Sequence, residues 1–109
     1  MNTLALFASG SGSNVENIYK YFKENDNIKV GLVLTDNPNA HVLERAKRLK
    51  IPYMCFSYKG TSSDDILKVL ESYEISHIIL GGYLRLIPQK IIRKFKNKIR
   101  KYQKFIKNN

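Results

Sequence analysis

The sequence predicts an α/β fold built on an open, mostly parallel sheet with helices on both faces. Three observations lead to this prediction. Short apolar stretches of strand length alternate along the chain with stretches of helical periodicity. The first of them is continuously apolar after Thr3, as in a strand covered on both faces. Each is followed by enough residues for a helix, which parallel pairing through right-handed crossovers requires. A chain of 109 residues fits one domain.

The first strand, expected over residues 3–8, runs directly into a glycine–serine turn and then into a helix. Ser13 suits the N-cap of that helix, and Glu16 stands three residues further on, at capping-box spacing. The helix carries one apolar stripe, formed by Val15, Ile18, Tyr19 and Phe22. We therefore expect the first strand to end at a helix N-terminus.

The turn between this strand and this helix predicts an anion site. Backbone N–H groups at a helix N-terminus lack partners and carry the positive end of the helix dipole. Gly10 and Gly12 would let a phosphate approach without a Cβ in the way. Neither common phosphate motif is matched, because Val15 replaces the third glycine of the dinucleotide fingerprint and no Walker lysine follows. The alternative is that the glycines only form a tight turn and Ser13 only caps the helix.

A second strand is expected over residues 28–35, followed by the turn signal Asp36-Asn37-Pro38-Asn39. Asp36 stands about 22 residues beyond the glycine turn, where an acidic residue holds a ribose hydroxyl in dinucleotide folds. We favour plain turn chemistry for Asp36, because the third glycine is absent. A short helix follows, marked by Val42, Leu43, Ala46 and Leu49.

The third expected strand, residues 51–56, contains Cys55, the only cysteine of the chain. One cysteine excludes an internal disulfide, and inside a strand we expect Cys55 to be a small buried hydrophobe. His41 and His77 stand alone, without the spacing of metal ligands around them. The sequence therefore predicts no metal site.

Ser62 and Asp65 open another helix at capping-box spacing, and residues 75–80 form the fourth expected strand. Ligands of open parallel sheets bind beyond the carboxyl ends of the strands, where the strand order reverses. Two loops reach that edge, Ser9–Asn14 after the first strand and Gly81–Pro88 after the fourth. We expect both loops to face one crevice.

The net charge of +10 is placed unevenly. All nine acidic residues lie at or before Glu74 and share that span with nine Lys and Arg residues, so the excess belongs to residues 75–109. One interpretation is a basic amphipathic helix that binds nucleic acid or an anionic membrane surface. We favour a helix that packs its apolar face on the sheet, so nucleic acid is not an expected partner. The apolar residues that recur there at helical spacings are Ile91, Ile92, Phe95, Ile99, Tyr102 and Ile106.

No stretch of the sequence reaches the ~20 apolar residues of a membrane span. The N-terminus lacks the basic region that opens a signal peptide. We therefore expect a cytoplasmic protein with no membrane partner.

Three segments together resemble the phosphoribosylglycinamide formyltransferase family. They are Phe7–Asn14, Val42–Pro52 and Gly81–Pro88, which occur in the family's order within residues 1–98. The resemblance implies a formyltransferase, Rossmann-like fold. It also implies transfer of a formyl group from 10-formyltetrahydrofolate to glycinamide ribonucleotide, a small-molecule substrate, in purine synthesis.

The same resemblance implies which residues bind these molecules. The phosphate of the ribonucleotide would bind at Gly12, Ser13 and Asn14. The formyl donor would bind along Leu84, Arg85, Leu86 and Ile87, largely through backbone groups and apolar contact. For Arg85, a solvated surface charge is the alternative.

The chain departs from this family after the position of Ile99. The family continues there as a strand into an Asn-x-His-Pro motif, whose Asn and His polarise the formyl carbonyl and move the proton. The segment Ile99–Asn109 contains no such motif, so we assign no catalytic residue. We expect a fold that is incomplete at its C-terminal end, with residues 1–98 as the nucleotide- and folate-binding part and 99–109 as a basic tail.

Two expectations follow from this departure. The chain alone should not turn over, and a phosphate-binding module without catalysis is the alternative function. A sheet cut after its fourth or fifth strand exposes an edge, which favours a homo-oligomer or pairing with a complementing fragment.

Overall fold

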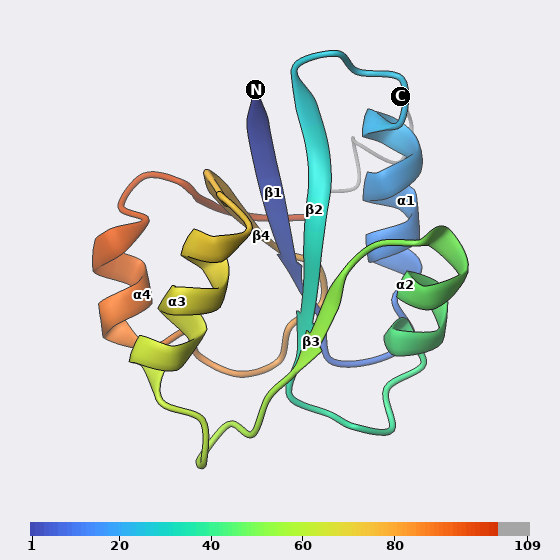
Figure 1. Ribbon diagram of the computed structural model, residues 1–109. Helices are drawn as coiled ribbons and strands as arrows, with labels where there is room; N and C mark the ends of the chain where they lie inside the picture. The colour runs from blue at the N-terminus through green and yellow to red at the C-terminus, as the bar shows by residue number, and fades with distance from the viewer. Residues whose placement is uncertain (103–109) are drawn as a thin grey trace.

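The computed structural model describes residues 1–102, which form a five-stranded sheet with helices on both faces (Figure 1). All strand pairs are parallel, so the predicted α/β class is confirmed. The strands are β1 (Asn2–Phe7), β2 (Ile28–Thr35), β3 (Tyr53–Cys55), β4 (His77–Leu80) and β5 (Ile99–Lys101). The helices are α1 (Ser13–Phe22), α2 (Val42–Leu49), α3 (Ser63–Ser72) and α4 (Gln89–Lys94).

The strand order is β3-β2-β1-β4-β5, so β2 and β3 follow on one side of β1, whereas β4 and β5 follow on its other side. On one side Leu6 of β1 pairs with Val33 of β2, and on the other side it pairs with Ile79 of β4. In open parallel sheets this reversal of strand order opens a crevice at the carboxyl ends of the two strands. The crevice lies where β1 and β4 end.

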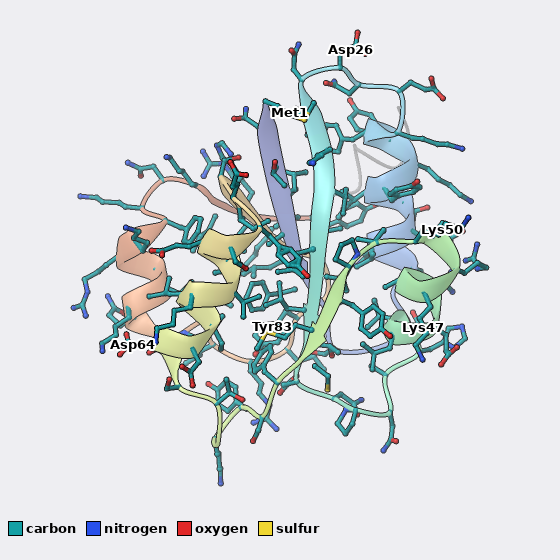
Figure 2. The ribbon with its side chains drawn as sticks, in the orientation of Figure 1. Met1, Asp26, Lys47, Lys50, Asp64 and Tyr83 are labelled. Atoms are coloured by element: carbon teal, nitrogen blue, oxygen red, sulfur yellow. The ribbon has the colours of Figure 1, made fainter. Side chains whose placement is uncertain are left out.

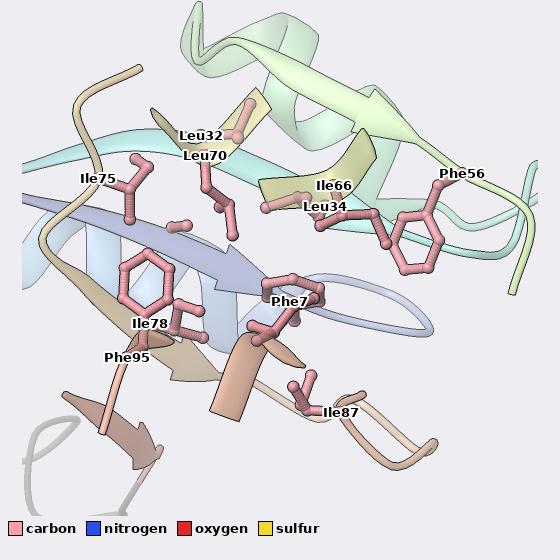
Figure 3. Packing of buried hydrophobic residues seen from close by; sticks show 12 residues of the cluster. Phe7, Leu32, Leu34, Phe56, Ile66, Leu70, Ile75, Ile78, Ile87 and Phe95 are labelled. Carbon is pink, nitrogen blue, oxygen red and sulfur yellow. The ribbon is translucent and has the colours of Figure 1, made fainter. Parts of the chain in front are cut away.

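Alternate residues of β1 face two separate hydrophobic cores, which is why its apolar run is continuous. Phe7 packs with Leu70 of α3 on the face that α3 and α4 cover (Figure 3). Leu6 packs with Ile18 of α1 on the face that α1 and α2 cover. Five of the six β1 residues are buried, so this strand is fixed from both sides.

The prediction that Cys55 is buried is wrong, because its side chain is exposed. β3 is an edge strand of only three residues, and in it only Met54 is partly covered. The strand begins at Tyr53 because Pro52 has no N–H to donate, although its carbonyl accepts the N–H of Val33 at 2.9 Å. Phe56, just after the strand, is the residue that enters the core.

A continuous basic helix over residues 91–106 is not formed within the described residues. α4 ends at Lys94, and Asn97 takes a positive φ of 65°, which ends any helical run. The chain then returns to the sheet, where Ile99 pairs with Ile78 of β4. The first residues of the expected basic tail therefore belong to the sheet, whereas residues 103–109 lie outside the described part. Every helix within residues 1–102 is too short or too polar to traverse a lipid bilayer.

Candidate functional site

The glycine loop (Ser9–Asn14) and the loop that follows β4 lie side by side at the carboxyl edge of the sheet. The N–H of Gly81 donates to the carbonyl of Phe7 at 2.8 Å. The N–H of Leu84 donates to the Ser9 hydroxyl at 2.9 Å. Ser9 and Leu84 also line one hollow, so the expectation that the two loops face one crevice is confirmed.

Three successive carbonyl groups of the glycine loop accept hydrogen bonds from the segment that contains the start of α2. The shortest of these contacts comes from an arginine side chain, which reaches across from α2. The donors are the Asn37 amide to Ser9 (3.4 Å), the Val42 N–H to Gly10 (3.1 Å) and the Arg45 Nε to Ser11 (2.7 Å). The peptide planes of the loop are therefore fixed by α2 and the turn before it.

This arrangement turns the N–H groups of Gly10, Ser11 and Gly12 away from α2. In a trans peptide unit the N–H points opposite to the C=O, and no peptide bond of the described residues is cis. Within residues 1–102 none of these three N–H groups has a hydrogen-bond partner. They stand beside the N-terminus of α1, where further N–H groups are unpaired. Successive free N–H groups at a helix N-terminus form a concavity that favours an anion.

Gly12 is required by the backbone at this point, independently of any ligand. It takes a φ of 83°, and a Cβ built on it would lie 2.6 Å from Cγ2 of Val42. Gly12, not Ser13, occupies the N-cap of α1, so the predicted Ser13 cap is wrong. Ser13 is the exposed first residue of the helix, and its N–H lies 3.4 Å from the Ser11 hydroxyl.

Glu16 does not complete a capping box, because three cations surround its carboxylate. Arg45 lies 2.6 Å and Arg48 2.5 Å from its Oε1, and Lys20 lies 3.1 Å from its Oε2. Hydrogen bonds from Lys20, Arg45 and Arg48, in that order of effect, lower the pKa of Glu16 to about 2. The negative charge in the first turn of α1 is thereby neutralised by its neighbours, so it does not oppose an anion at the loop.

Asn14 lies against the glycine pair that ends β4. A Cβ on Gly81 would stand 3.5 Å from the Asn14 Cβ, and one on Gly82 would stand 3.4 Å from its Nδ2. Gly82 also takes a positive φ of 84°. Asn14 therefore contacts the loop after β4 from the glycine loop, and it is half-buried.

The four residues Leu84–Ile87 divide into exposed and buried positions. Leu84 and Leu86 are 86% and 83% exposed, which is unusual for two leucines so close in sequence. Ile87 is buried in the core that α3 and α4 cover. The segment therefore presents two apolar side chains to solvent from a backbone that is anchored at its end.

Arg85 is not a free surface charge, because its Nε lies 2.6 Å from Oδ2 of Asp36. The Asp36 side chain is only 7% exposed, so turn chemistry alone does not describe it either. Sequence reasoning treated these residues separately and missed the pair. The signal was available, since opposite charges follow β2 and β4 at the same edge of the sheet.

Two hollows flank this ion pair. The larger, of about 540 Å³, lies between the loops that follow β2, β3 and β4, and Tyr58 and Lys59 line it. The smaller, of about 410 Å³, reaches toward Ser9 and Leu84. Both hollows share Asp36, Pro38 and Arg85. The ion pair therefore lies at the boundary between the two hollows.

Tyr83, labelled in Figure 2, is half-buried and packs against the core that α3 and α4 cover. Its ring contacts that of Phe7 edge to face, with centroids 5.4 Å apart. Burial, and next the negative charge of Asp36, raise the pKa of Tyr83 well above its ordinary value. Its phenol therefore stays protonated and cannot serve as a base near neutral pH. Among residues 1–102 no group of three His, Cys, Asp or Glu side chains is placed to hold a metal ion.

Comparison with known proteins gives one consistent result. Residues 2–102 match the family model described as formyl transferase. The phosphoribosylglycinamide formyltransferase of Bacillus subtilis is 37% identical over 105 residues, which covers 91% of this chain and 54% of that protein. A chloroplastic relative from Arabidopsis thaliana with the same name is 31% identical, and the match covers 88% of this chain and 35% of that protein.

Solved structures agree with these sequence matches. Glycinamide ribonucleotide transformylase 1 from Geobacillus kaustophilus superposes with a TM-score of 0.84 at 39% identity, covering 91% of this chain and 56% of that one. The phosphoribosylglycinamide formyltransferase of Brucella melitensis gives a TM-score of 0.82 at 28% identity, covering 90% and 54%. The chain spans about half the length of these proteins.

Proposed function

Because the chain belongs to the formyl transferase family, we propose that it supplies the nucleotide- and folate-binding part of a phosphoribosylglycinamide formyltransferase. Such an enzyme transfers a formyl group from 10-formyltetrahydrofolate to glycinamide ribonucleotide in purine synthesis. The binding part corresponds to residues 1–98. A cytoplasmic location accompanies this proposal, although the Arabidopsis relative is described as chloroplastic.

One observation carries the proposal, namely the orientation of the glycine loop. Its carbonyl groups are held toward α2, so the N–H groups of Gly10–Gly12 are left free beside the N-terminus of α1. A dianionic phosphate at this concavity would receive charge-assisted hydrogen bonds, which are stronger than neutral ones. We assign Gly12, Ser13 and Asn14 to the phosphate of glycinamide ribonucleotide.

We assign the formyl donor to the segment Leu84–Ile87, called the donor segment below. Leu84 and Leu86 expose apolar surface that a flat ring system could cover, and Leu84 lines the smaller hollow. Asn14 lies against the Gly81-Gly82 pair, which supports assigning both reactants to one crevice. The two reactants would therefore meet where β1 and β4 end.

No residue of this chain is assigned to the chemical step. Formyl transfer passes through a tetrahedral intermediate, whose oxyanion needs placed donors and whose amine must lose a proton to a base. Residues 1–109 contain no Asn-x-His-Pro motif to supply these groups. We expect binding without turnover from this chain.

The test is calorimetric titration of the purified chain with glycinamide ribonucleotide, after a cooperative thermal unfolding transition has been recorded. We expect saturable binding at one site, weakened about tenfold by Asn14→Ala, as expected for loss of one contact to a charged group. Asn17→Ala, one turn further along α1, is the matched control. Absence of binding by the folded chain would overturn the assignment of the glycine loop.

The same titration with AMP distinguishes the proposed function from the alternative, a phosphate-binding module without catalysis. A phosphate-binding module without substrate preference would bind AMP and glycinamide ribonucleotide with equal affinity. A formyltransferase binding part would prefer glycinamide ribonucleotide.

A further inference from the structure

Three consecutive residues of the donor segment are each held by a different loop at the carboxyl edge of the sheet. The loops follow β1, β2 and β3 in turn. The contacts are Ser9 Oγ with the N–H of Leu84 (2.9 Å), Asp36 Oδ2 with Nε of Arg85 (2.6 Å), and the Tyr58 hydroxyl with the carbonyl of Leu86 (3.2 Å). The segment is therefore held by the loops that follow three different strands, β1, β2 and β3.

The contact between Asp36 and Arg85 is the most constrained of the three. A carboxylate that is 7% exposed is costly without a partner, and Arg85 is the cation that reaches it. The Arg85 guanidinium in turn lies 4.5 Å from the centre of the Tyr58 ring. Asp36 and Tyr58 thus fix the same arginine from two directions.

These contacts explain how Leu84 and Leu86 stay exposed. A loop with two free leucines lowers its energy by folding them inward, unless its backbone is held elsewhere. Here the N–H of Leu84, the side chain of Arg85 and the carbonyl of Leu86 are all engaged. The segment is preorganised, so binding an apolar ligand would cost less ordering entropy.

We propose that Asp36 and Tyr58 are positioning residues that hold the Leu84–Leu86 backbone ready for the formyl donor. Asp36 acts through Arg85, and Tyr58 acts through Arg85 and the carbonyl of Leu86. The inference rests on the proposed function for the identity of the ligand, but the positioning itself is a property of the free chain.

The first measurement is amide hydrogen exchange of residues 83–87 in the free chain. Asp36→Asn removes the charge that holds Arg85, and Tyr58→Phe removes only the hydroxyl while keeping the ring. We expect exchange in this segment to rise about fivefold or more in each variant, since one contact is lost in each, with β1 and β4 unchanged. Glu44→Gln is the control, because Glu44 pairs with Lys47 within α2 (Lys47 is labelled in Figure 2), on the face of the sheet opposite to α3 and α4.

The second measurement is titration with tetrahydrofolate, compared with titration with glycinamide ribonucleotide. We expect both variants to lose about fivefold in tetrahydrofolate affinity and to keep their affinity for the ribonucleotide. Equal losses for both ligands would indicate a merely structural role and overturn the proposal. Unchanged exchange in both variants would overturn it as well.

The two proposals fail in different ways. If the unaltered chain binds no tetrahydrofolate, the donor part of the proposed function is wrong. Hydrogen exchange of residues 83–87 still decides whether Asp36 and Tyr58 hold the segment.

Discussion

Arg45 of α2 joins the glycine loop to α1, because its Nε contacts the carbonyl of Ser11 at 2.7 Å and its Nη1 contacts Glu16 at 2.6 Å. Both contacts use the guanidinium as a rigid fork, which a lysine cannot reproduce. The side chain is 25% exposed, so neither contact is fully screened by water. Arg45 therefore orients the loop, and its charge is directed at Ser11 and Glu16 rather than at an incoming phosphate.

The first prediction concerns Arg45→Met. Loss of the bond to Ser11 frees that peptide plane, and the N–H of Gly12 then no longer faces the crevice. We expect affinity for glycinamide ribonucleotide to fall about tenfold, measured by calorimetry. Arg48→Met is the matched control, because Arg48 also contacts Glu16 but has no bond to the loop. Equal losses in the two variants would mean that net charge, not loop geometry, sets the affinity.

The second prediction compares how alanine substitution at two glycines of the same loop changes the free energy of unfolding. Gly12→Ala introduces a Cβ at a φ of 83° and 2.6 Å from Val42, so we expect a loss of about 2–4 kcal/mol in unfolding free energy. A Cβ on Gly10 would meet no atom within 4 Å, so Gly10→Ala should change stability by less than about 0.5 kcal/mol. Urea unfolding followed by circular dichroism measures both. Similar losses in the two variants would contradict the loop geometry.

The third prediction follows from the lowered pKa of Glu16. A carboxylate whose pKa is lower in the folded than in the unfolded state contributes stability above its unfolded pKa. That contribution is lost as pH falls from the ordinary value of 4.5 through about 2. We expect Glu16→Gln to have a lower melting temperature than the unaltered chain at pH 6. The two melting temperatures should converge near pH 2. High salt should reduce the difference in melting temperature at pH 6, because it screens the ion pairs of Glu16. A difference in melting temperature that stays constant from pH 6 to pH 2 would contradict the prediction.

The order and type of the strands and helices could be predicted because local pattern and tertiary packing agree. The second strand, residues 28–35, is found with its predicted ends, since turn residues stand on both sides of it. The cap of α3 is confirmed too, with the Ser62 hydroxyl accepting the N–H of Asp65 at 3.1 Å. These features depend on neighbours in sequence.

The features that sequence reasoning missed depend on neighbours in space. Glu16 has capping-box spacing, yet two arginines about 30 residues away compete for it and prevail. Asp36 and Arg85 follow two strands that end at the same edge of the parallel sheet, but only the three-dimensional structure shows that their side chains meet. Cys55 was misplaced for the same reason, since an edge strand and a central strand look alike in sequence.

The last prediction concerns Ser9, which links the two proposed binding sites. Its carbonyl lies in the glycine loop and its hydroxyl accepts the N–H of Leu84, so order in one segment favours order in the other. We expect tetrahydrofolate to raise the affinity of the unaltered chain for glycinamide ribonucleotide by about threefold, the worth of one hydrogen bond, and the reverse effect to be equal. In Ser9→Ala the enhancement should disappear, while each ligand alone still binds. Ser72→Ala is the control, because within residues 1–102 the Ser72 hydroxyl bonds only to the carbonyl of Val69, in the same helix. If the enhancement survives in Ser9→Ala, the two sites communicate through Asn14 and the Gly81-Gly82 pair instead.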